Sequence, residues 1–253
     1  MNLSVLFTPS EFAALSERRL ESTACVVFDI LRATSTLVTA LAHGAESILP
    51  VVDIPQALEA RALDSSLLLA GERGGERIKK ALTGSIDFDL GNSPREFTEA
   101  RVKNRRIAMT TTNGTRALKA CQGAAAVLAC SFLNLSATAR YLQNLSVDHV
   151  ILVCAGTGEN GASEDTLGAG ALCRRLEALG KVVPADDSVW MAASLYDLVA
   201  PKLVQALARS QNGRRLTALP DLAADVEGCA ATDLYNLVAS TDPDGRLRTV
   251  VPL

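Results

Sequence analysis

The chain has 253 residues, of which 48% are hydrophobic and 21% are charged, and its formal net charge is −3. A globular chain of this length buries about 70–75% of its unfolded surface, so it has room for a substantial core. The small negative charge gives no general reason to bind nucleic acid or an anionic membrane, and no run of 18 apolar residues is present. We expect neither kind of partner, and basic residues that matter must act locally.

Cysteine and histidine usage is typical of a reduced, cytoplasmic protein. The six cysteines are scattered, mostly inside apolar runs and without a CxxC pair, which favours buried thiols over a disulfide framework. The first residues lack a basic-then-apolar secretion signal. With only two histidines, a zinc or copper site is not expected. A bound metal would be held by carboxylates, and Mg²⁺ is then the first candidate.

Apolar periodicity predicts strands that alternate with helices along the chain. After an edge strand at 1–7, strands are expected at 24–28, 47–52, 67–70, 107–109, 125–130, 149–155 and 181–184. Helices are expected at 11–22, over a segment containing 37–41, at 53–63, at 116–122, up to 145, up to 179, and at 187–210 with a break near 201. An apolar segment at 249–253 ends the chain. This alternation predicts an α/β fold.

The two halves of the chain repeat one order of elements. The matching segments are 26–41 with 107–120, 47–63 with 125–145, and 67–75 with 150–161. An offset of about 80 residues between matching segments suggests a duplicated unit. We therefore predict one domain over residues 1–253, built from two related βαβαβ halves, 1–100 and 101–253, whose loops face a shared cleft.

The end of the strand at 24–28 is the first candidate site. Asp29, Arg32 and the hydroxyls of Thr34, Ser35 and Thr36 follow it directly, at the start of a helix. Open α/β proteins bind ligands at such junctions. Arginine can bind a phosphate or carboxylate with two hydrogen bonds, and an aspartate can hold a hard cation. A threonine cap beside a salt-bridged Asp29–Arg32 pair explains the same residues, so this stretch alone leaves both interpretations open.

Two further strand ends carry similar chemistry. The turn TTTNGTR at 110–116 places hydroxyls, an amide and an arginine between a strand and a helix. Because a helix cap needs only one such residue, this turn favours a phosphate-binding site over a simple helix cap. The loop GERGG at 71–75 sets glycines beside an acid and an arginine, which indicates close approach of the backbone to another group.

Several phosphate-handling signatures are absent, and one rival signature is present. The sequence contains no P-loop, and Leu31 occupies the position where an aspartyl-nucleophile phosphatase has its second acid. The loop after Cys154 lacks the arginine of a thiol phosphatase, so Cys154 is expected to be a packed thiol. GTGENG at 156–161 matches the dinucleotide-binding pattern GxGxxG, so an NAD-type oxidoreductase stays an alternative. Glu164 and Asp165 at the following helix start would repel a pyrophosphate, unless a cation lies between them.

Six motifs in fixed order, from about residue 24 to 240, closely resemble the 2-phosphosulfolactate phosphatase (ComB-like) family. They are VFDILRATST at 27–36, GERGG at 71–75, FDLGNSP at 88–94, TTTNGTR at 110–116, CAGTG at 154–158 and EDTLGAG at 164–170. The resemblance implies a three-layer α/β/α fold and Mg²⁺-dependent hydrolysis of 2-phospho-3-sulfolactate to 3-sulfolactate and phosphate. In archaea this reaction serves coenzyme M synthesis, a pathway that bacterial members need not share.

A substrate with a phosphate, a carboxylate and a sulfonate requires placed cations. The expected catalytic residues are Asp29, Glu72 and Asp165, and the expected Mg²⁺ ligands are Asp29, Glu72, Glu164 and Asp165. The expected substrate-binding residues are Arg32, Thr34, Arg73, Asn92, Thr112, Asn113, Thr115, Arg116, Ser131 and Thr157. We expect water activated by the metal to attack the phosphate, with a covalent phosphate on Asp29 as the alternative. A non-catalytic phospho-metabolite binder also remains open, as does a homodimer.

Overall fold

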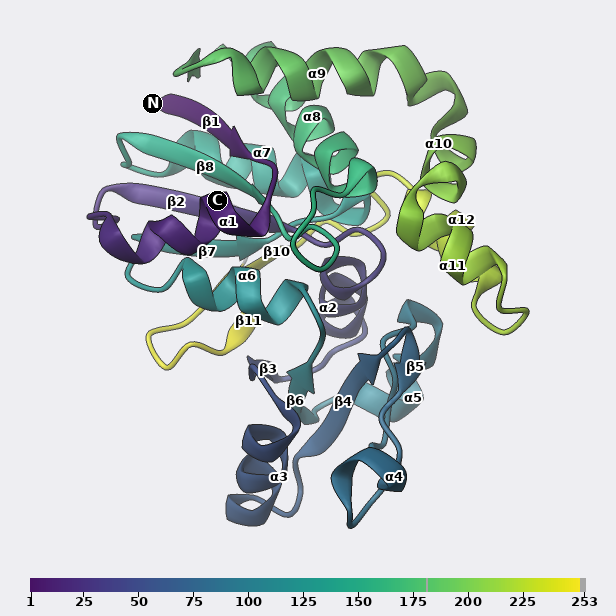
Figure 1. Ribbon diagram of the computed structural model, residues 1–253. Helices are drawn as coiled ribbons and strands as arrows, with labels where there is room; N and C mark the ends of the chain where they lie inside the picture. The colour runs from purple at the N-terminus through teal and green to yellow at the C-terminus, as the bar shows by residue number, and fades with distance from the viewer. Residues whose placement is uncertain (181, 251–253) are drawn as a thin grey trace.

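The computed structural model describes residues 1–180 and 182–250. All of the strands within them form one eleven-stranded sheet, in the order β5-β4-β6-β3-β11-β10-β7-β2-β8-β1-β9, with helices on both faces (Figure 1). The strands are β1 (Asn2–Leu6), β2 (Thr23–Phe28), β3 (Ser47–Pro50), β4 (Leu68–Arg73), β5 (Glu76–Arg77), β6 (Arg106–Thr110), β7 (Ala126–Ala129), β8 (His149–Cys154), β9 (Val183–Pro184), β10 (Val238–Thr241) and β11 (Leu247–Val250).

The helices follow the strands in alternation over most of the chain. They are α1 (Pro9–Ala13), α2 (Ala33–Ala42), α3 (Ile54–Leu63), α4 (Lys80–Thr83), α5 (Glu99–Val102), α6 (Gly114–Ala120), α7 (Leu135–Asn144), α8 (Ser163–Ala178), α9 (Asp187–Val199), α10 (Leu203–Arg209), α11 (Gln211–Thr217) and α12 (Ala223–Ala230). Short 3-10 turns are η1 (Ala14–Glu17), η2 (Pro94–Glu96), η3 (Phe132–Asn134) and η4 (Ala200–Lys202).

The sheet consists of two groups of parallel strands joined by a hairpin. β2 pairs in parallel with β7 and β8, and β6 pairs in parallel with β3 and β4. The antiparallel hairpin β10–β11 connects the groups, because β10 pairs with β7 and β11 pairs with β3. In Figure 1, β3 to β6 lie with α3, α4 and α5 in the lower part of the molecule, and α10 to α12 lie above the tip of β4 and β5.

In each predicted half, the strand that precedes a threonine-rich turn lies among the strands of the other half. β2 belongs to residues 1–100 but lies between β7 and β8, whereas β6 belongs to residues 101–253 but lies between β3 and β4. The halves therefore interleave in the sheet and are not two separate lobes. The duplication itself stays a prediction.

Alternation along β2 produces the three layers. Ala24, Val26 and Phe28 are buried against the helices of one face, in a cluster that includes residues of α7, α8 and α9. Cys25 and Val27 are buried on the other face with residues of α1, α2 and α6. A strand buried on both faces reads as a continuous apolar run, as the sequence of β2 does. A third cluster packs α3 on β4 and β6.

The α/β class, the three layers and the break of the helix near residue 201 are confirmed. The helix predicted at 11–22 is shorter, because α1 ends at Ala13 and η1 at Glu17. Leu20 is buried but lies five residues after Leu15, a spacing that a helix does not bring to one face. The hairpin β10–β11 was not predicted. Residue 181 of the expected strand at 181–184 and residues 251–253 of the apolar segment lie outside the described residues.

No helix in the described part of the chain is long and apolar enough to cross a membrane.

Candidate active site

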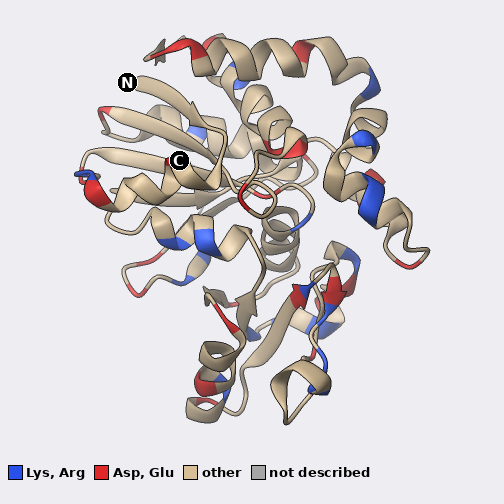
Figure 2. Cartoon of the chain, viewed as in Figure 1, with Lys and Arg blue, Asp and Glu red and all other residues tan. Residues whose placement is uncertain are grey.

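The carboxyl ends of β2, β4, β6 and β8 meet at a cavity of about 140 Å³. Because these strands are parallel, the loops that follow them emerge at the same edge of the sheet. Helix α11 closes the cavity from the side, and Figure 2 shows acidic and basic segments where α11 approaches the tip of β4 and β5. The lining residues are Asp29, Leu31, Arg32, Glu72, Gly75, Asn92, Thr112, Asn113, Thr157, Gly158, Asn212, Arg215 and Leu216.

Asp29 lies at the end of β2 and is buried. The Ala33 N–H group donates to its Oδ1 atom over 3.1 Å. A Cβ atom on Gly114 would come within 2.7 Å of its Oδ2 atom, so glycine is needed there for this close approach. Burial raises the pKa of Asp29 to about 7, and the negative charges of Glu72 and Glu164 raise it as well. Three carboxylates therefore share one site.

Glu164 and Asp165, adjacent in the first turn of α8, have different environments. The N–H groups of Ile30 and Gly156 donate to Asp165 Oδ1 and Oδ2 over 2.8 and 3.0 Å, so this carboxylate joins the ends of β2 and β8. Burial and the charge of Glu164 raise the pKa of Asp165 well above its usual range. Asn212 Nδ2 donates to Glu164 Oε1, but Glu164 Oε2 is buried without a hydrogen-bond partner.

Glu72 forms hydrogen bonds with two loops of the cavity. Its Oε1 atom accepts hydrogen bonds from the N–H and hydroxyl groups of Thr112, over 2.8 and 2.9 Å. Its Oε2 atom accepts from the Gly75 N–H group over 2.8 Å. Glu72 thereby fixes the backbone of the turn after β6 and of the turn after β4.

Arg32 is almost fully buried, at 3% exposure, and is held by a residue that the sequence did not suggest. Its Nη1 atom lies 2.7 Å from Asp225 Oδ2, and its Nη2 atom donates to the Gly75 carbonyl over 2.7 Å. Asp225 also accepts hydrogen bonds from Ser93 and Arg95. A buried ion pair of this kind fixes the direction of the guanidinium group.

Asn92, Thr112, Asn113 and Thr157 place polar atoms on the cavity wall. Asn92 is 5% exposed, and its Oδ1 atom has no hydrogen-bond partner in the structure. A buried amide oxygen without a partner is costly, and a bound ligand is one way to satisfy it.

The other predicted substrate-binding residues do not line the cavity. The hydroxyl groups of Thr34, Thr115 and Ser131 bond to nearby backbone at helix starts. Arg73 donates to the carbonyl of Glu72 and to Thr110, and Arg116 pairs with Glu159 on the surface. Their substrate contacts stay predictions, which this geometry does not favour.

The structure adds Asn212, Arg215 and Asp225 to the residues at or around the cavity. All three lie in helices after residue 210 and far from any strand end, so no turn motif marks them in the sequence. Asn212 Nδ2 donates to Glu164 Oε1 over 2.7 Å and to Thr157 Oγ1 over 2.8 Å, which ties α11 to the loop after β8.

The residues of the cavity fit a hard cation, although none of the described residues forms a complete metal cage of three or more His, Cys, Asp or Glu side chains. The negative charges of Glu72 and Glu164 act on Asp29, and Glu164 Oε2 lacks a partner. Mg²⁺ is commonly bound through one or two carboxylates, with water and substrate phosphate as the other ligands. This donor set meets that requirement.

The geometry of the glycine-rich loop does not favour the dinucleotide alternative. Gly156 N–H, which would face a pyrophosphate, already donates to Asp165. Glu164 and Asp165 are both buried at the start of α8, where a nucleotide phosphate would have to lie. Cys154 is buried as well, and burial raises the pKa of its thiol well above the usual range, as expected of a packed thiol.

Fold and cavity define an α/β protein with a polar cavity at the carboxyl ends of parallel strands, lined by carboxylate, amide, hydroxyl and guanidinium groups. A family model described as 2-phosphosulpholactate phosphatase matches residues 11–243, and the chain belongs to this family.

Relatives bearing the name "Probable 2-phosphosulfolactate phosphatase" are similar over most of their length. The protein from Carboxydothermus hydrogenoformans is 38% identical, over 98% of this chain and 94% of the relative. The protein from Synechococcus sp. (strain JA-3-3Ab) is 41% identical, over 85% of this chain and 87% of the relative. The protein from Thermotoga maritima is 36% identical, over 87% and 89%.

Proposed function

We propose that this protein is a Mg²⁺-dependent phosphatase that hydrolyses 2-phospho-3-sulfolactate, or a similar small phosphorylated hydroxy acid, in the cavity at Asp29. The observation that carries the proposal is that Asp29 and Glu72 line one small cavity together with hydroxyl, amide and guanidinium donors, with the charge of Glu164 acting on Asp29 from beside it. The family and the names of its members supply the substrate class.

Phosphoryl transfer depends chiefly on positioning and on charge neutralisation. Thr112, Asn113 and Asn92 present hydrogen-bonding groups to a phosphate in the cavity. Arg32, held by Asp225, presents a guanidinium group of fixed direction, and arginine matches phosphate geometry. These groups orient the ester so that water attacks the phosphorus atom opposite the bond that breaks, between phosphorus and the oxygen on carbon 2.

Asp29 and Glu164 would hold Mg²⁺, Glu164 through the Oε2 atom that has no hydrogen-bond partner. Glu72 and Asp165 accept hydrogen bonds on both of their oxygens, so their role as ligands stays a prediction. When bound, the ion supplies positive charge against the phosphate oxygens and polarises the groups around it. Asp29 is the residue we assign to accept the proton of the attacking water, because it is the carboxylate that lines the cavity at the end of β2. The departing oxygen takes a proton and becomes the hydroxyl group of the product.

Phosphate release from a panel of phosphorylated hydroxy acids, with Mg²⁺ and with EDTA, tests the proposal. We expect Mg²⁺-dependent release, fastest with 2-phospho-3-sulfolactate. Quenching radiolabelled reactions in acid should leave no phosphate on the protein, and a burst of bound phosphate would instead identify Asp29 as the nucleophile. Binding of the esters without release would point to a binder, and quenching of NADH fluorescence without phosphate release would point to an oxidoreductase.

A cytoplasmic location is part of the proposal. All six cysteines are free and buried in the structure, which suits a reducing compartment. A role in coenzyme M synthesis and a homodimer stay predictions.

A further inference from the structure

Arg215 of helix α11 lines the cavity but makes no hydrogen bond or ion pair with any other described residue. Other arginines near the site are engaged: Arg32 with Asp225 and Gly75, Arg73 with Glu72 and Thr110, and Arg95 with Asp225. The guanidinium group carries five N–H donors in a fixed fork. Arg215 therefore brings an unused binding group for a planar or tetrahedral anion to the cavity wall.

The turn between β4 and β5 is shaped around this guanidinium group. Gly74 and Gly75 have φ angles of +69° and +86°, which favour glycine. A Cβ atom on Gly74 would lie 3.2 Å from Arg215 Nη2, and one on Gly75 would lie 3.7 Å from Arg215 Nε. The N–H and carbonyl groups of Gly75 also bond to Glu72 and Arg32, so the turn that lies against Arg215 is itself fixed by two charged side chains.

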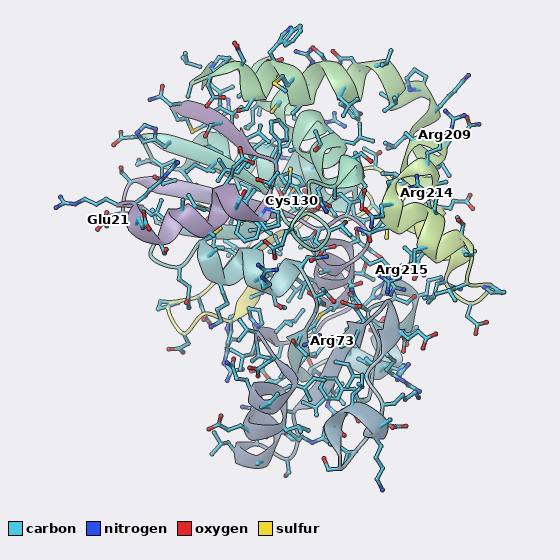
Figure 3. All side chains as sticks on the ribbon, viewed as in Figure 1. Glu21, Arg73, Cys130, Arg209, Arg214 and Arg215 are labelled. Atoms are coloured by element: carbon cyan, nitrogen blue, oxygen red, sulfur yellow. The ribbon has the colours of Figure 1, made fainter. Side chains whose placement is uncertain are left out.

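Helix α11 reaches two parts of the site with one face. Asn212 and Arg215 are three residues apart, so they share a side of the helix. Asn212 bonds to Glu164, among the carboxylates, while Arg215 lies against the glycine turn. Figure 3 shows Arg215 between α11 and the lower part of the molecule, below Arg209 and Arg214. Arg215 thus brings a guanidinium group to the same cavity that Asp29 and Glu72 line.

A neighbouring hollow of about 430 Å³ shares Arg32, Gly75 and Asn92 with the cavity. The described residues that line it include no cationic side chain without a partner. Its Arg77 donates to the Asp89 carbonyl, and its Lys79 lies 3.6 Å from Asp87. Among the cations of both spaces, Arg215 is therefore the one whose donors are free within the described structure.

We propose that Arg215 binds the second anionic group of the substrate, the carboxylate or sulfonate that stays on the product, and so selects esters that carry one. This inference rests on the proposed function for the identity of the substrate. It makes Arg215 a specificity-determining residue on the wall of the cavity that α11 forms. Loss of a charge-assisted hydrogen bond of this type commonly weakens binding by about 10- to 100-fold.

The variant Arg215→Gln removes the charge, and Arg214→Gln is its matched control, because Arg214 is the adjacent arginine and its Nη1 atom donates to the carbonyl of Arg209. Three phosphate esters separate the candidate groups: 2-phospho-3-sulfolactate, 2-phospholactate, which lacks the sulfonate, and isopropyl phosphate, which lacks both acids. We expect Arg215→Gln to raise KM for the first by about 10-fold or more with little change in kcat, and to leave isopropyl phosphate unaffected. The response of 2-phospholactate then tells which acid Arg215 binds.

Arg215→Lys should restore part of the lost affinity, because lysine keeps the charge but not the fork. Equal behaviour of the Arg215→Gln and Arg214→Gln variants, or the same loss on all three esters, would overturn the inference.

Calorimetric binding of 3-sulfolactate separates this inference from the proposed function. The wild type and Arg214→Gln should bind it, and Arg215→Gln should bind it at least 10-fold more weakly. If the wild type releases no phosphate from any ester, the proposed function fails, while this binding difference would still support the anion site at Arg215. Unchanged binding in Arg215→Gln, or no binding to the wild type, would overturn the anion site whatever the phosphatase assay shows.

Discussion

The two threonine-rich junctions, β2–α2 and β6–α6, occupy matching places, since each follows the central strand of three parallel strands. Both close with the same local device. Thr34 Oγ1 donates to the Asp29 carbonyl and accepts from its N–H group, and Thr115 Oγ1 does the same with Thr111. In both, the hydroxyl on the helix side holds the turn.

What the junctions present to the cavity differs. The β2–α2 junction presents Asp29 and Arg32, both buried, whereas the β6–α6 junction presents Thr112 and Asn113 and turns Arg116 to the surface. In both junctions the threonine hydroxyl fixes the backbone of the turn, whereas the residues between the strand and that threonine determine which groups reach the cavity. We infer that the first junction contributes charged groups to the site and that the second contributes hydrogen-bonding groups.

The largest effect is expected from Asp29→Asn, which removes the charged group of the first junction. We expect kcat for phosphate release to fall by about 100-fold or more, because a neutral amide neither accepts the proton nor holds a cation. Thr112→Val, in the second junction, removes one hydroxyl and should cost only about 10-fold. If both variants lose the same factor, the assigned division of roles is wrong.

Asp225→Asn should be next, because it releases Arg32 of the first junction. Removing one partner of a buried ion pair typically destabilises by about 3–5 kcal/mol, so chemical denaturation should show a loss of this order together with a higher KM. Asp233→Asn is the matched control, since Asp233 likewise holds an arginine and a serine, Arg175 and Ser136, but outside the cavity. A KM that rises equally in both variants would refute the positioning role of Asp225.

The buried charge of Asp29 also predicts a pH effect on stability in EDTA. Its native pKa of about 7 lies above the ordinary value of 3.8, so the native state keeps a proton that the unfolded chain releases. This contribution is complete below about pH 4 and is lost as pH rises through 7. The Tm of Asp29→Asn relative to the wild type should therefore rise by several degrees between pH 5 and pH 8. A difference in Tm that is flat with pH would mean that Asp29 titrates normally.

The smallest effect is expected from Arg116→Gln in the second junction. Arg116 and Glu159 form an exposed ion pair, which is worth little, and Arg116 does not line the cavity. Steady-state kinetics should change by less than about 3-fold. A loss as large as the loss of about 10-fold expected of Thr112→Val would return Arg116 to the substrate-binding residues.

The sequence predicted those parts of the site that depend on strand ends. Asp29, Thr112 and Thr157 follow parallel strands and Glu72 lies at the carboxyl end of another, and parallel strands bring these ends to one edge. It could not separate anion-binding hydroxyls from caps, because the same residue types serve both, as Thr34 and Thr115 show.

Long-range packing explains what the sequence did not reveal. Arg215 and Asp225 lie in a helical segment without a local motif, and only its packing onto the cavity gives them a role. The hairpin β10–β11 is equally hidden. β11 meets β3 at the single pair Leu247 and Ile48, so little in either segment marks the pairing.

In the proposed site, carboxylates from separate strand ends bind one Mg²⁺ ion. The most direct test of this binding is the rate of phosphate release from 2-phospho-3-sulfolactate as Mg²⁺ is returned to EDTA-treated protein, for the wild type and for Glu164→Gln. We predict no release without the ion, saturable recovery in the wild type, and a Mg²⁺ midpoint at least 10-fold higher in the variant. Full activity in EDTA, or equal midpoints in the two proteins, would contradict the account.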